Sequence, residues 1–387
     1  MISGFRHNIM KKRILFITQH LGRTGSEMVL WYLLKNLNSQ EYDVSVFCIR
    51  KGELYDLLPD FIEKHVMYKH SPKWTDRAYR RIIKLFGIDP LHHQLNKIQR
   101  SFKADIWYVN TVAVPEVFQI PRPDGVKIIT HIHEYLNAFG DVRRQTLERV
   151  FSYADAWIGC SEMVCKAISD LKDTNVYLQN SFIDTDTIDT DSQKIHEIKN
   201  RLGIAPEDFV WVVSGGARYM KGLDYILPIL AHFEDKNIKI LWLGPRLDNG
   251  LEFYVSNVVQ KKYLDRLIFA GDLSDDYYNY MSVANGFLLL SREETFSLVM
   301  VEAAYLGIPL VAFKTGIAAE FIKPDMGVSV DQGNLNDLLM GMNSIHQGFK
   351  IDVNRMRAAA MVYDVKHQLP LYEALLNQIS EDLTRLN

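Results

Sequence analysis

The sequence predicts an α/β protein made of two Rossmann-like domains, each with a parallel sheet. Short apolar runs alternate with amphipathic helical patterns along nearly the whole chain, and 387 residues are enough for two domains of ordinary size. A polar segment from Asn180 to Lys194, poor in large apolar residues, separates two such alternations. We therefore expect a first domain at residues 12–182 and a second at residues 183–387.

The apolar runs predict the strands of both sheets. Parallel neighbours need crossover connections, which are nearly always helices, and helical patterns such as 27–37 and 146–153 lie between the runs. The last helical pattern, 369–386, could pack back on the first domain or on the second. The predicted strands are Ile14 to Thr18, Tyr42 to Ile49, Ile106 to Asn110, Lys127 to His131, Ala156 to Cys160, Val176 to Leu178, Phe209 to Ser214, Ile238 to Leu243, Leu267 to Ala270, Gly286 to Leu290, Pro309 to Ala312 and Gly327 to Val330.

Charge, cysteine content and the length of the apolar runs argue against several classes of protein. The net charge of -3 and a pI near 6.5 do not indicate nucleic-acid binding, and no basic run is interleaved with aromatic residues. Three cysteines without metal-ligand spacing favour a reducing compartment, and no run approaches the ~18 apolar residues of a membrane span. We expect a cytoplasmic protein. Residues 1–180 carry 25 Lys and Arg against 19 Asp and Glu, so this half could face an anionic surface.

The segment from Ser291 to Phe313 carries the strongest functional signal. Glu294 and Glu302 stand at the junction of a predicted strand and a helix that begins near Leu298. Ligands of open α/β sheets bind at the carboxyl ends of strands, and the N–H groups of a helix start can hold a phosphate. Glu302 lies in a helix that is apolar almost all round, so it should be buried and meet a cation or ligand hydroxyls. A satisfied structural carboxylate is the alternative.

These carboxylates, with seven residues between them and AAYLGIPLVAF after them, resemble the nucleotide-sugar signature of glycosyltransferase family 4. The resemblance implies the two-domain GT-B fold and a retaining hexosyltransferase that moves a sugar from a nucleoside-diphosphate sugar to an acceptor, with no metal or other cofactor. The resemblance spans nearly the whole chain. Its further pieces are Gly22 to Glu27, His131 to Glu134, Ala154 to Glu162, Asn180, Ser214 to Gly222, Thr315, Gly316 and Glu320.

The resemblance places the donor site in the second half. A departing diphosphate develops negative charge, which cations and N–H groups stabilise in the transition state. Arg218 and Lys221 are the implied cations, although two surface cations at a helix start are the alternative. Glu294 would hold hydroxyls of the transferred sugar, and Glu302 would accept hydrogen bonds from the ribose. The N–H groups that would bind the phosphate belong to Phe296, Ser297 and Leu298.

The first half supplies further implied site residues. Gly25 opens a helix, and its missing side chain would let the backbone approach the phosphates or the acceptor. His133 stands where the family places a histidine close to the donor sugar. His131 would point to the opposite face of its strand and be structural. No general base stands out, and by resemblance the leaving phosphate takes the acceptor proton. The implied catalytic set is therefore His133, Glu294, Arg218 and Lys221.

The chain departs from the pattern of the family in three places. Thr295 and Ser297 stand where glycines are usual, and the early loop has Thr24, Gly25 and Ser26 rather than two adjacent glycines. Arg218 also stands closer to Lys221 than in many members of the family. None of these changes removes a charged group that the reaction needs.

The polar segment also contains two Asp-Thr-Asp triplets, at 184–186 and 189–191. They superficially match the metal-binding motif of the other main glycosyltransferase fold. Because they do not follow a buried strand, we expect a solvated junction and no metal site. Two other functions stay open: a GT-B-fold sugar-nucleotide epimerase, which would turn over its donor without an acceptor, and a non-catalytic nucleotide-sugar-binding protein.

Residues 74–88 form a predicted helix that is both basic and rich in aromatic residues. Such helices can lie on anionic lipid. With the positive first half, this pattern suggests peripheral contact with the inner face of a membrane and an acceptor that is a glycan or lipid-linked glycan of a surface polysaccharide. An ordinary solvated helix is the alternative. The cations are Arg77, Arg80, Arg81 and Lys84.

Overall fold

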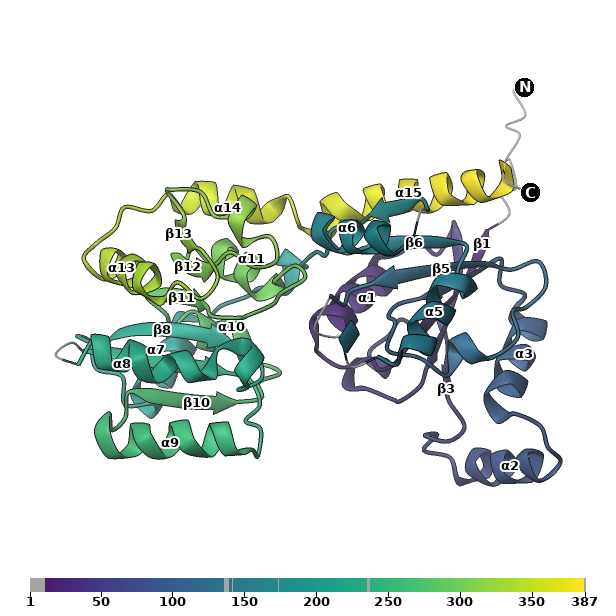
Figure 1. Ribbon diagram of the computed structural model, residues 1–387, viewed down its shortest axis with the longest axis horizontal. Coiled ribbons are helices and arrows are strands. Elements are labelled where there is room, and N and C mark those ends of the chain that lie inside the picture. The colour runs from purple at the N-terminus through teal and green to yellow at the C-terminus, as the bar shows by residue number, and fades with distance from the viewer. Residues whose placement is uncertain (1–10, 136–138, 141, 173, 235–236, 386–387) are drawn as a thin grey trace. The chain divides into compact units, whose positions relative to one another are not determined.

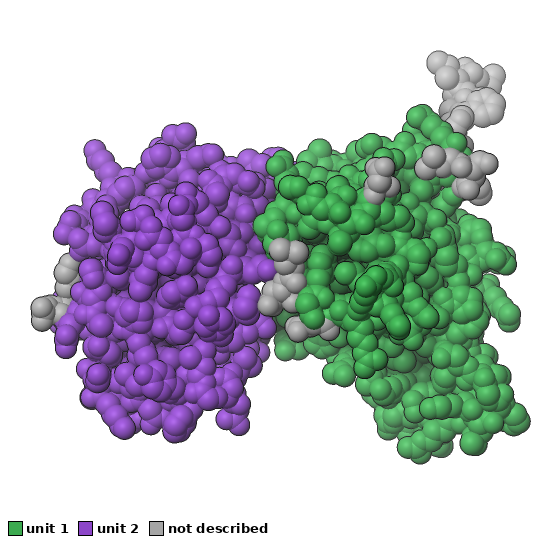
Figure 2. Space-filling model, viewed as in Figure 1, with its two compact units in different colours: residues 1–181, 368–387 green, residues 182–367 purple. Residues whose placement is uncertain are grey.

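The computed structural model describes residues 11–135, 139–140, 142–172, 174–234 and 237–385. The chain forms two compact units, which Figure 2 shows in different colours. Unit 1 consists of residues 1–181 and 368–387, and unit 2 consists of residues 182–367. Each unit has a parallel sheet with helices packed on it (Figure 1), so the predicted α/β class with two Rossmann-like sheets is confirmed.

Within the described residues, the unit 1 sheet has seven parallel strands. In sheet order they are β3 (Glu63–Val66), β2 (Tyr42–Cys48), β1 (Lys12–Thr18), β4 (Ile106–Val109), β5 (Lys127–Ile132), β6 (Ala156–Gly159) and β7 (Val176–Leu178). The strand order reverses between β1 and β4, which makes their carboxyl ends the switch point of this sheet. Strand β3 was not predicted, because its residues EKHV form an edge strand without an apolar run.

The helices of unit 1 follow the predicted alternation. The first of them begins with a capping box, in which the Thr24 N–H donates to the Glu27 carboxylate at 3.0 Å. The described helices before the final one are α1 (Gly25–Asn36), α2 (Trp74–Leu85), α3 (Pro90–Phe102), α5 (Arg144–Tyr153) and α6 (Glu162–Leu171), with the short 3-10 helices η1 (Glu53–Tyr55) and η2 (Val117–Gln119).

The final helix, α15 (Val365–Arg385), completes unit 1 (Figure 1). The Tyr372 ring meets the Tyr108 ring of β4 with 5.9 Å between the ring centres, and the Tyr177 hydroxyl of β7 donates to Asp382 at 2.8 Å. The buried side chains of α15 recur every three or four positions, as expected for one face of a helix. They are Tyr372, Leu376, Ile379 and Leu383.

Within the described residues, the unit 2 sheet has six parallel strands. In sheet order they are β10 (Leu267–Gly271), β9 (Ile238–Leu243), β8 (Phe209–Ser214), β11 (Gly286–Leu289), β12 (Leu310–Phe313) and β13 (Gly327–Val330). Val210 and Val212 of β8 face one apolar cluster, whereas Trp211 and Val213 face another. Both faces of the sheet are therefore covered, which explains why its strands are continuous apolar runs.

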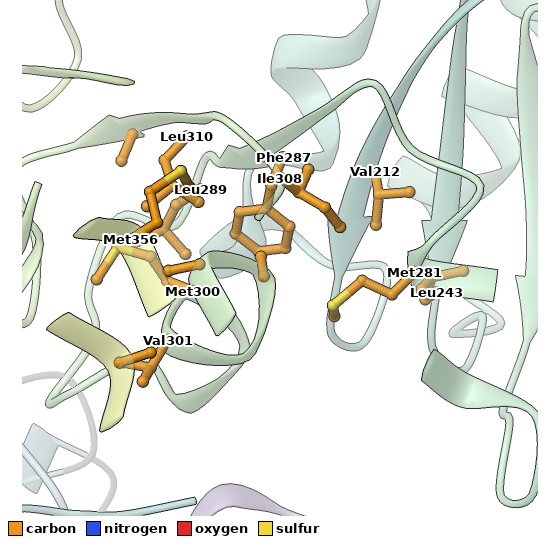
Figure 3. Close-up of a cluster of buried hydrophobic side chains, with 14 of the residues drawn as sticks. Val212, Leu243, Met281, Phe287, Leu289, Met300, Val301, Ile308, Leu310 and Met356 are labelled. Carbon is orange, nitrogen blue, oxygen red and sulfur yellow. The ribbon is translucent and has the colours of Figure 1, made fainter. Parts of the chain in front are cut away.

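The helices of unit 2 cover these two faces. Met300 and Val301 lie in the same buried cluster as Phe287 and Leu289 (Figure 3), so the helix that carries Glu302 is fixed against the sheet. The described helices are α7 (Ser192–Arg201), α8 (Ile226–His232), α9 (Gly250–Lys262), α10 (Tyr277–Met281), α11 (Leu298–Tyr305), α12 (Ala318–Phe321), α13 (Leu335–His346) and α14 (Val353–Met361), with η3 (Thr185–Thr187), η4 (Tyr219–Lys221) and η5 (Leu223–Tyr225).

The predicted solvated junction at 180–194 is wrong for its first part, because residues 182–185 are buried. Ile183 forms a parallel bridge with Asp364, which lies just before the chain returns to unit 1. The buried Asp364 carboxylate accepts hydrogen bonds from the N–H and the hydroxyl of Thr185, at 2.9 and 2.5 Å. The sequence suggested a solvated segment because the segment is polar. In the structure these polar groups form hydrogen bonds with residues far along the sequence, which allows them to be buried.

The Asp-Thr-Asp triplets make local structural hydrogen bonds. Asp184 accepts from the Asp186 N–H at 3.2 Å, and Asp191 caps α7 by accepting from the Gln193 N–H at 2.8 Å. Asp186 forms an ion pair with Lys366 at 2.5 Å. In the described part of the chain, no three His, Cys, Asp or Glu side chains are grouped so that they could hold a metal ion.

Candidate functional site

The carboxyl ends of β8 and β11 form the switch point of the unit 2 sheet. The sheet order continues from β8 to β9 and β10 on one side, and from β11 to β12 and β13 on the other. Ligand crevices of open α/β sheets lie at such points. The loop after β8 carries Arg218 and Lys221, and the loop after β11 carries Glu294. Three predicted site residues thus come from the two loops that meet there.

Lys221 and Glu294 form an ion pair between these loops. The Lys221 Nζ lies 2.5 Å from the Glu294 Oε1, and the two side chains are only 20% and 12% exposed. Their charges therefore interact through less water than those of a surface pair, which strengthens the attraction. In this arrangement each side chain neutralises the other, so an anion that binds Lys221 must compete with Glu294.

Two glycines let the β8 loop pack against the end of β11. Gly222 has a φ of 80°, and a Cβ there would lie 2.5 Å from the backbone oxygen of Leu290. A Cβ at Gly215 would lie 3.2 Å from the Lys221 Cε. A side chain at position 222 would therefore push the loop away from β11 and separate Lys221 from Glu294.

Arg292 holds the same loop and was not predicted as a site residue. Its guanidinium donates to the Asp224 carboxylate through two hydrogen bonds, of 2.9 and 2.7 Å, and lies 3.6 Å from the ring centre of Tyr219. Bidentate pairing combined with stacking on an aromatic ring is characteristic of arginine. The sequence signal that could have pointed to Arg292 is its position between the end of β11 and Glu294.

Arg218 differs from Arg292 in its surroundings. It is exposed, and among the described residues its side chain has no ion-pair partner and no hydrogen bond to the side chain of Lys221 or Glu294. The structure therefore places Arg218 on the predicted loop, but does not join it to the ion pair. Its guanidinium is available to an anionic ligand.

The start of α11 has an unusual backbone. Ser297, the residue before the helix, has a φ of 82° and a ψ of 70°, the left-handed region that glycine favours. It keeps this glycine-like conformation at a position where the resemblance led us to expect glycine. Its buried hydroxyl has no hydrogen-bond partner among the described residues. Since the first N–H groups of a helix have no intrahelical partners, this helix start offers several unused polar groups.

The loop after β12 supports the loop that leads into α11. The Thr315 hydroxyl accepts a hydrogen bond from the Glu294 N–H at 2.8 Å, and a Cβ at Gly316 would lie 2.7 Å from the Phe296 backbone oxygen. The Phe296 side chain is buried, with its ring centre 5.1 Å from that of Tyr363. The side chain of Phe296 therefore belongs to the core, and its backbone is what remains for a ligand.

Glu302 is buried in α11, as predicted, and is 7% exposed. The Tyr278 hydroxyl of α10 donates to its Oε1 at 3.2 Å, and no cation of the described chain pairs with it. Burial raises the pKa of the Glu302 carboxyl to about 7, and the hydrogen bond from Tyr278 offsets only part of this effect. A buried carboxyl with one protein donor has acceptor capacity left for the hydroxyls of a ligand.

Replacing Glu302 with glutamine should stabilise the protein above pH 7. In the folded protein Glu302 keeps its proton up to about pH 7, whereas an ordinary glutamate has a pKa of 4.5. Wild-type stability therefore falls as pH rises from 4.5 to 7, by at most about 3 kcal/mol. Glutamine carries no such charge, so its melting temperature should exceed that of wild type increasingly from pH 5 to pH 8. Thermal unfolding from pH 5 to pH 8 measures this difference in melting temperature, and Glu207→Gln, at an exposed position, is the control. A difference between Glu302→Gln and wild type that does not change with pH would contradict the explanation by a buried proton.

The predicted residues of unit 1 lie at its own switch point. Gly25 is exposed and is the first residue of α1, while His133 follows β5. Asn110, which follows β4, connects these loops through hydrogen bonds to the Ser26 carbonyl and to the His133 ring, both at 3.2 Å. The β1 loop packs tightly against Gly52, since a Cβ at Gly52 would lie 2.1 Å from the Leu21 carbonyl oxygen.

The two histidines do not point to opposite faces, so that prediction is wrong. Strand β5 ends at Ile132, and the His131 and His133 rings lie against each other with centres 3.9 Å apart. His131 is buried and hydrogen-bonded to the Tyr108 hydroxyl at 2.7 Å, as a structural histidine should be. Burial lowers the pKa of His133 to about 3, so this ring is neutral at physiological pH.

Comparison with known proteins shows what the domain that carries the Lys221–Glu294 pair is similar to. Residues 194–360 match the family model of glycosyl transferases group 1. This match lies within unit 2 and includes Glu302. An uncharacterized glycosyltransferase of Haemophilus influenzae is 22% identical over 341 residues, covering 86% of this chain and 90% of that protein.

Solved structures with this fold match over both units. Anabaena HepE in complex with UDP and glucose has a TM-score of 0.75 and 18% identity, with 95% of this chain and 100% of that chain covered. Sucrose-phosphate synthase from Thermosynechococcus elongatus has a TM-score of 0.76 and 16% identity, with 96% and 100% covered. The predicted GT-B fold is thereby confirmed, and the family match of unit 2 supports a glycosyltransferase.

Proposed function

We propose that the protein is a retaining hexosyltransferase that moves a sugar from a nucleoside-diphosphate sugar to an acceptor without a metal ion. The observation that carries the proposal is the Lys221–Glu294 ion pair at the β8–β11 switch point, in a segment that matches glycosyl transferases group 1. A cation, a carboxylate and a helix start on one edge of a sheet suit a ligand that carries both phosphates and hydroxyl groups.

The donor would bind unit 2 through charges and N–H groups. Lys221 and the exposed Arg218 would stabilise the diphosphate as it leaves, which replaces the charge neutralisation that a metal ion would supply. The α11 start, with the N–H groups of Phe296, Ser297 and Leu298, would hold a phosphate. Glu294 would hold hydroxyls of the transferred sugar, and Glu302 would accept hydrogen bonds from the ribose.

The reaction breaks the bond between the anomeric carbon of the sugar and the diphosphate oxygen, and forms a bond from that carbon to the acceptor oxygen. The acceptor proton passes to the departing phosphate, so the protein needs no general base, and attack from the same face retains the configuration. Gly25 would allow backbone approach to the phosphates or the acceptor. His133, which is neutral, would hydrogen-bond the transferred sugar.

A thermal-shift panel tests the donor site. A ligand that binds only the native protein raises its melting temperature. At one hundred times its Kd, the ligand adds about 2.7 kcal/mol to the free energy of unfolding. We expect one series of nucleoside diphosphates and sugar nucleotides to raise the melting temperature equally with and without EDTA. Loss of the shift in EDTA would contradict metal independence. Turnover of the donor without acceptor would instead point to an epimerase, and no shift at all to a protein without this function.

The acceptor side of the proposal concerns α2, which lies at the periphery of unit 1 (Figure 1). Trp74 is 72% exposed, and Leu85 and Phe86 are 85% and 78% exposed, close to basic residues. No described helix is long and apolar enough to span a membrane. Exposed apolar side chains among cations suit an anionic lipid surface. We propose that α2 docks on the inner face of the cytoplasmic membrane and that the acceptor is a glycan or lipid-linked glycan of a surface polysaccharide.

Sedimentation with vesicles tests the docking of α2. At low salt the protein should bind vesicles that contain phosphatidylglycerol and not vesicles of phosphatidylcholine alone, because the contact needs anionic headgroups. The double variant Trp74→Ser and Phe86→Ser should bind at least about tenfold more weakly, since two exposed aromatic side chains no longer enter the interface. Phe253→Ser, at a 68% exposed position of α9, is the matched control. Equal binding by all three proteins would contradict the assignment to α2.

A further inference from the structure

Asn110 joins three loops of the unit 1 switch point, and no motif in the sequence singled it out. It follows β4 and is buried. Its Nδ2 donates to the carbonyl of Ser26, in the first turn of α1, at 3.2 Å. Its Oδ1 lies 3.2 Å from the Nε2 of His133, which follows β5. One amide group therefore spans the loops after β1, β4 and β5.

The Ser26 carbonyl fixes the direction of this bridge. A carbonyl oxygen only accepts hydrogen bonds, so the Asn110 atom that faces it must be the amide nitrogen. The atom that faces His133 is then the amide oxygen, which also only accepts. The hydrogen bond between Asn110 and His133 therefore requires a hydrogen on Nε2. A neutral imidazole has one such hydrogen, and its Nδ1 carries a lone pair instead.

The surroundings of His133 keep the ring neutral and oriented. The His131 ring lies 3.9 Å away, centre to centre, and two adjacent imidazolium cations would repel each other. Among the described residues no hydrogen bond to the His133 Nδ1 is found. The backbone N–H of His133 donates to the Glu134 carboxylate at 3.0 Å, and this carboxylate also accepts from the Thr111 hydroxyl. The β4 loop thus holds both the ring and the backbone of His133.

We propose that Asn110 is a positioning residue that holds His133 as the Nε2–H tautomer, and so makes the His133 Nδ1 an acceptor for a hydroxyl of the donor sugar. The inference rests on the proposed function and deepens it, because it says which hydrogen-bonding group the sugar must present. A sugar that lacks this hydroxyl leaves a lone pair unsatisfied, and such mismatches produce strong discrimination.

The tautomer is measured first, on the full chain with ¹⁵N-labelled histidine side chains. Long-range ¹H–¹⁵N spectra distinguish Nε2–H from Nδ1–H imidazole, and the His133→Gln variant assigns the signals. We expect the His133 ring to be the Nε2–H tautomer in wild type and a mixture of the two tautomers in Asn110→Ala. Asn110→Asp keeps an acceptor toward Nε2, so it should restore the single tautomer. Thr111→Val removes the neighbouring hydroxyl, which donates to Glu134, and this variant should keep the single tautomer of His133. An Nδ1–H or doubly protonated His133 in wild type overturns the proposal, whatever sugar the protein transfers.

Kinetics with UDP-glucose and its monodeoxy analogues test recognition of the hydroxyl. Wild type should lose at least about tenfold in kcat/KM with one analogue, and Asn110→Ala should lose that discrimination together with about tenfold in kcat/KM for UDP-glucose. Equal discrimination in both proteins overturns the proposal. Because the tautomer is measured without a ligand, an Nε2–H His133 in a protein that binds no sugar nucleotide would refute the proposed function, and the role in hydroxyl recognition with it.

Discussion

Replacing Lys221 with alanine is expected to lower kcat/KM for sugar transfer by about 10²–10³-fold. A preorganised donor aimed at developing negative charge is worth this much in other enzymes. Lys221 is held in place by the β8 loop and is only 20% exposed, so water cannot fully replace its charge. Release of the nucleoside diphosphate, followed over a range of donor concentrations, measures the loss.

The loss should depend on the diphosphate. With UDP-glucose, UDP and uridine as probes of the proposed donor site, Lys221→Ala should weaken binding of the two phosphorylated probes much more than binding of uridine, because uridine has no phosphate. Lys314→Ala is the matched control, since Lys314 follows β12 of the same sheet and pairs with Asp331 at a more exposed position. An equal loss of affinity for uridine and for UDP would show that Lys221 does not bind the diphosphate.

Replacing Glu294 with glutamine is expected to act in opposite directions on binding and on transfer. The neutral amide releases Lys221, which in the wild-type protein lies 2.5 Å from the Glu294 carboxylate. UDP should therefore bind roughly fivefold more tightly, since the competing charge of a partly buried pair is worth about 1 kcal/mol. Sugar transfer should fall by about 10²-fold, because the carboxylate no longer accepts strong hydrogen bonds from the sugar hydroxyls.

Titration calorimetry with UDP and with UDP-glucose separates these two effects. Glu293→Gln removes the same charge from the adjacent position, and should change the affinity for UDP by less than about twofold if distance from Lys221 decides the effect. Weaker UDP binding by Glu294→Gln than by wild type would mean that the ion pair positions Lys221 for the phosphates rather than competing with them.

The sequence predicted those features that depend on short-range pattern. Continuous apolar runs marked β8 and β11, and the apolar helix around Glu302 marked that carboxylate as buried. The start of α11 at Leu298 was also visible in the sequence. These predictions succeeded because hydrophobic periodicity and the burial that it predicts follow from residues that are close together along the chain.

The rest depended on contacts between distant residues. The ion pair joins positions 73 residues apart, and no spacing rule relates them. The Asp364 contact that buries residues 182–185 spans 179 residues. The histidine prediction failed for a local reason: residues 131 and 133 are two positions apart, and side chains two positions apart along a strand share a face, so the two rings meet. Side-chain bridges such as Asn110 become visible only once the strand order is known.

Helix α15 has a consequence for how the protein is synthesised. Unit 2 is one uninterrupted stretch of the sequence, whereas unit 1 needs the part of α15 from residue 368 onward, which is made after unit 2. Tyr372 and Leu383 of this helix are buried in unit 1. A ribosome adding 5–20 residues per second takes roughly 10 to 40 s to go from residue 181 to residue 383. During that interval the surface that α15 covers on β4 and β7 stays exposed, so the unit that emerges first is the last to be finished.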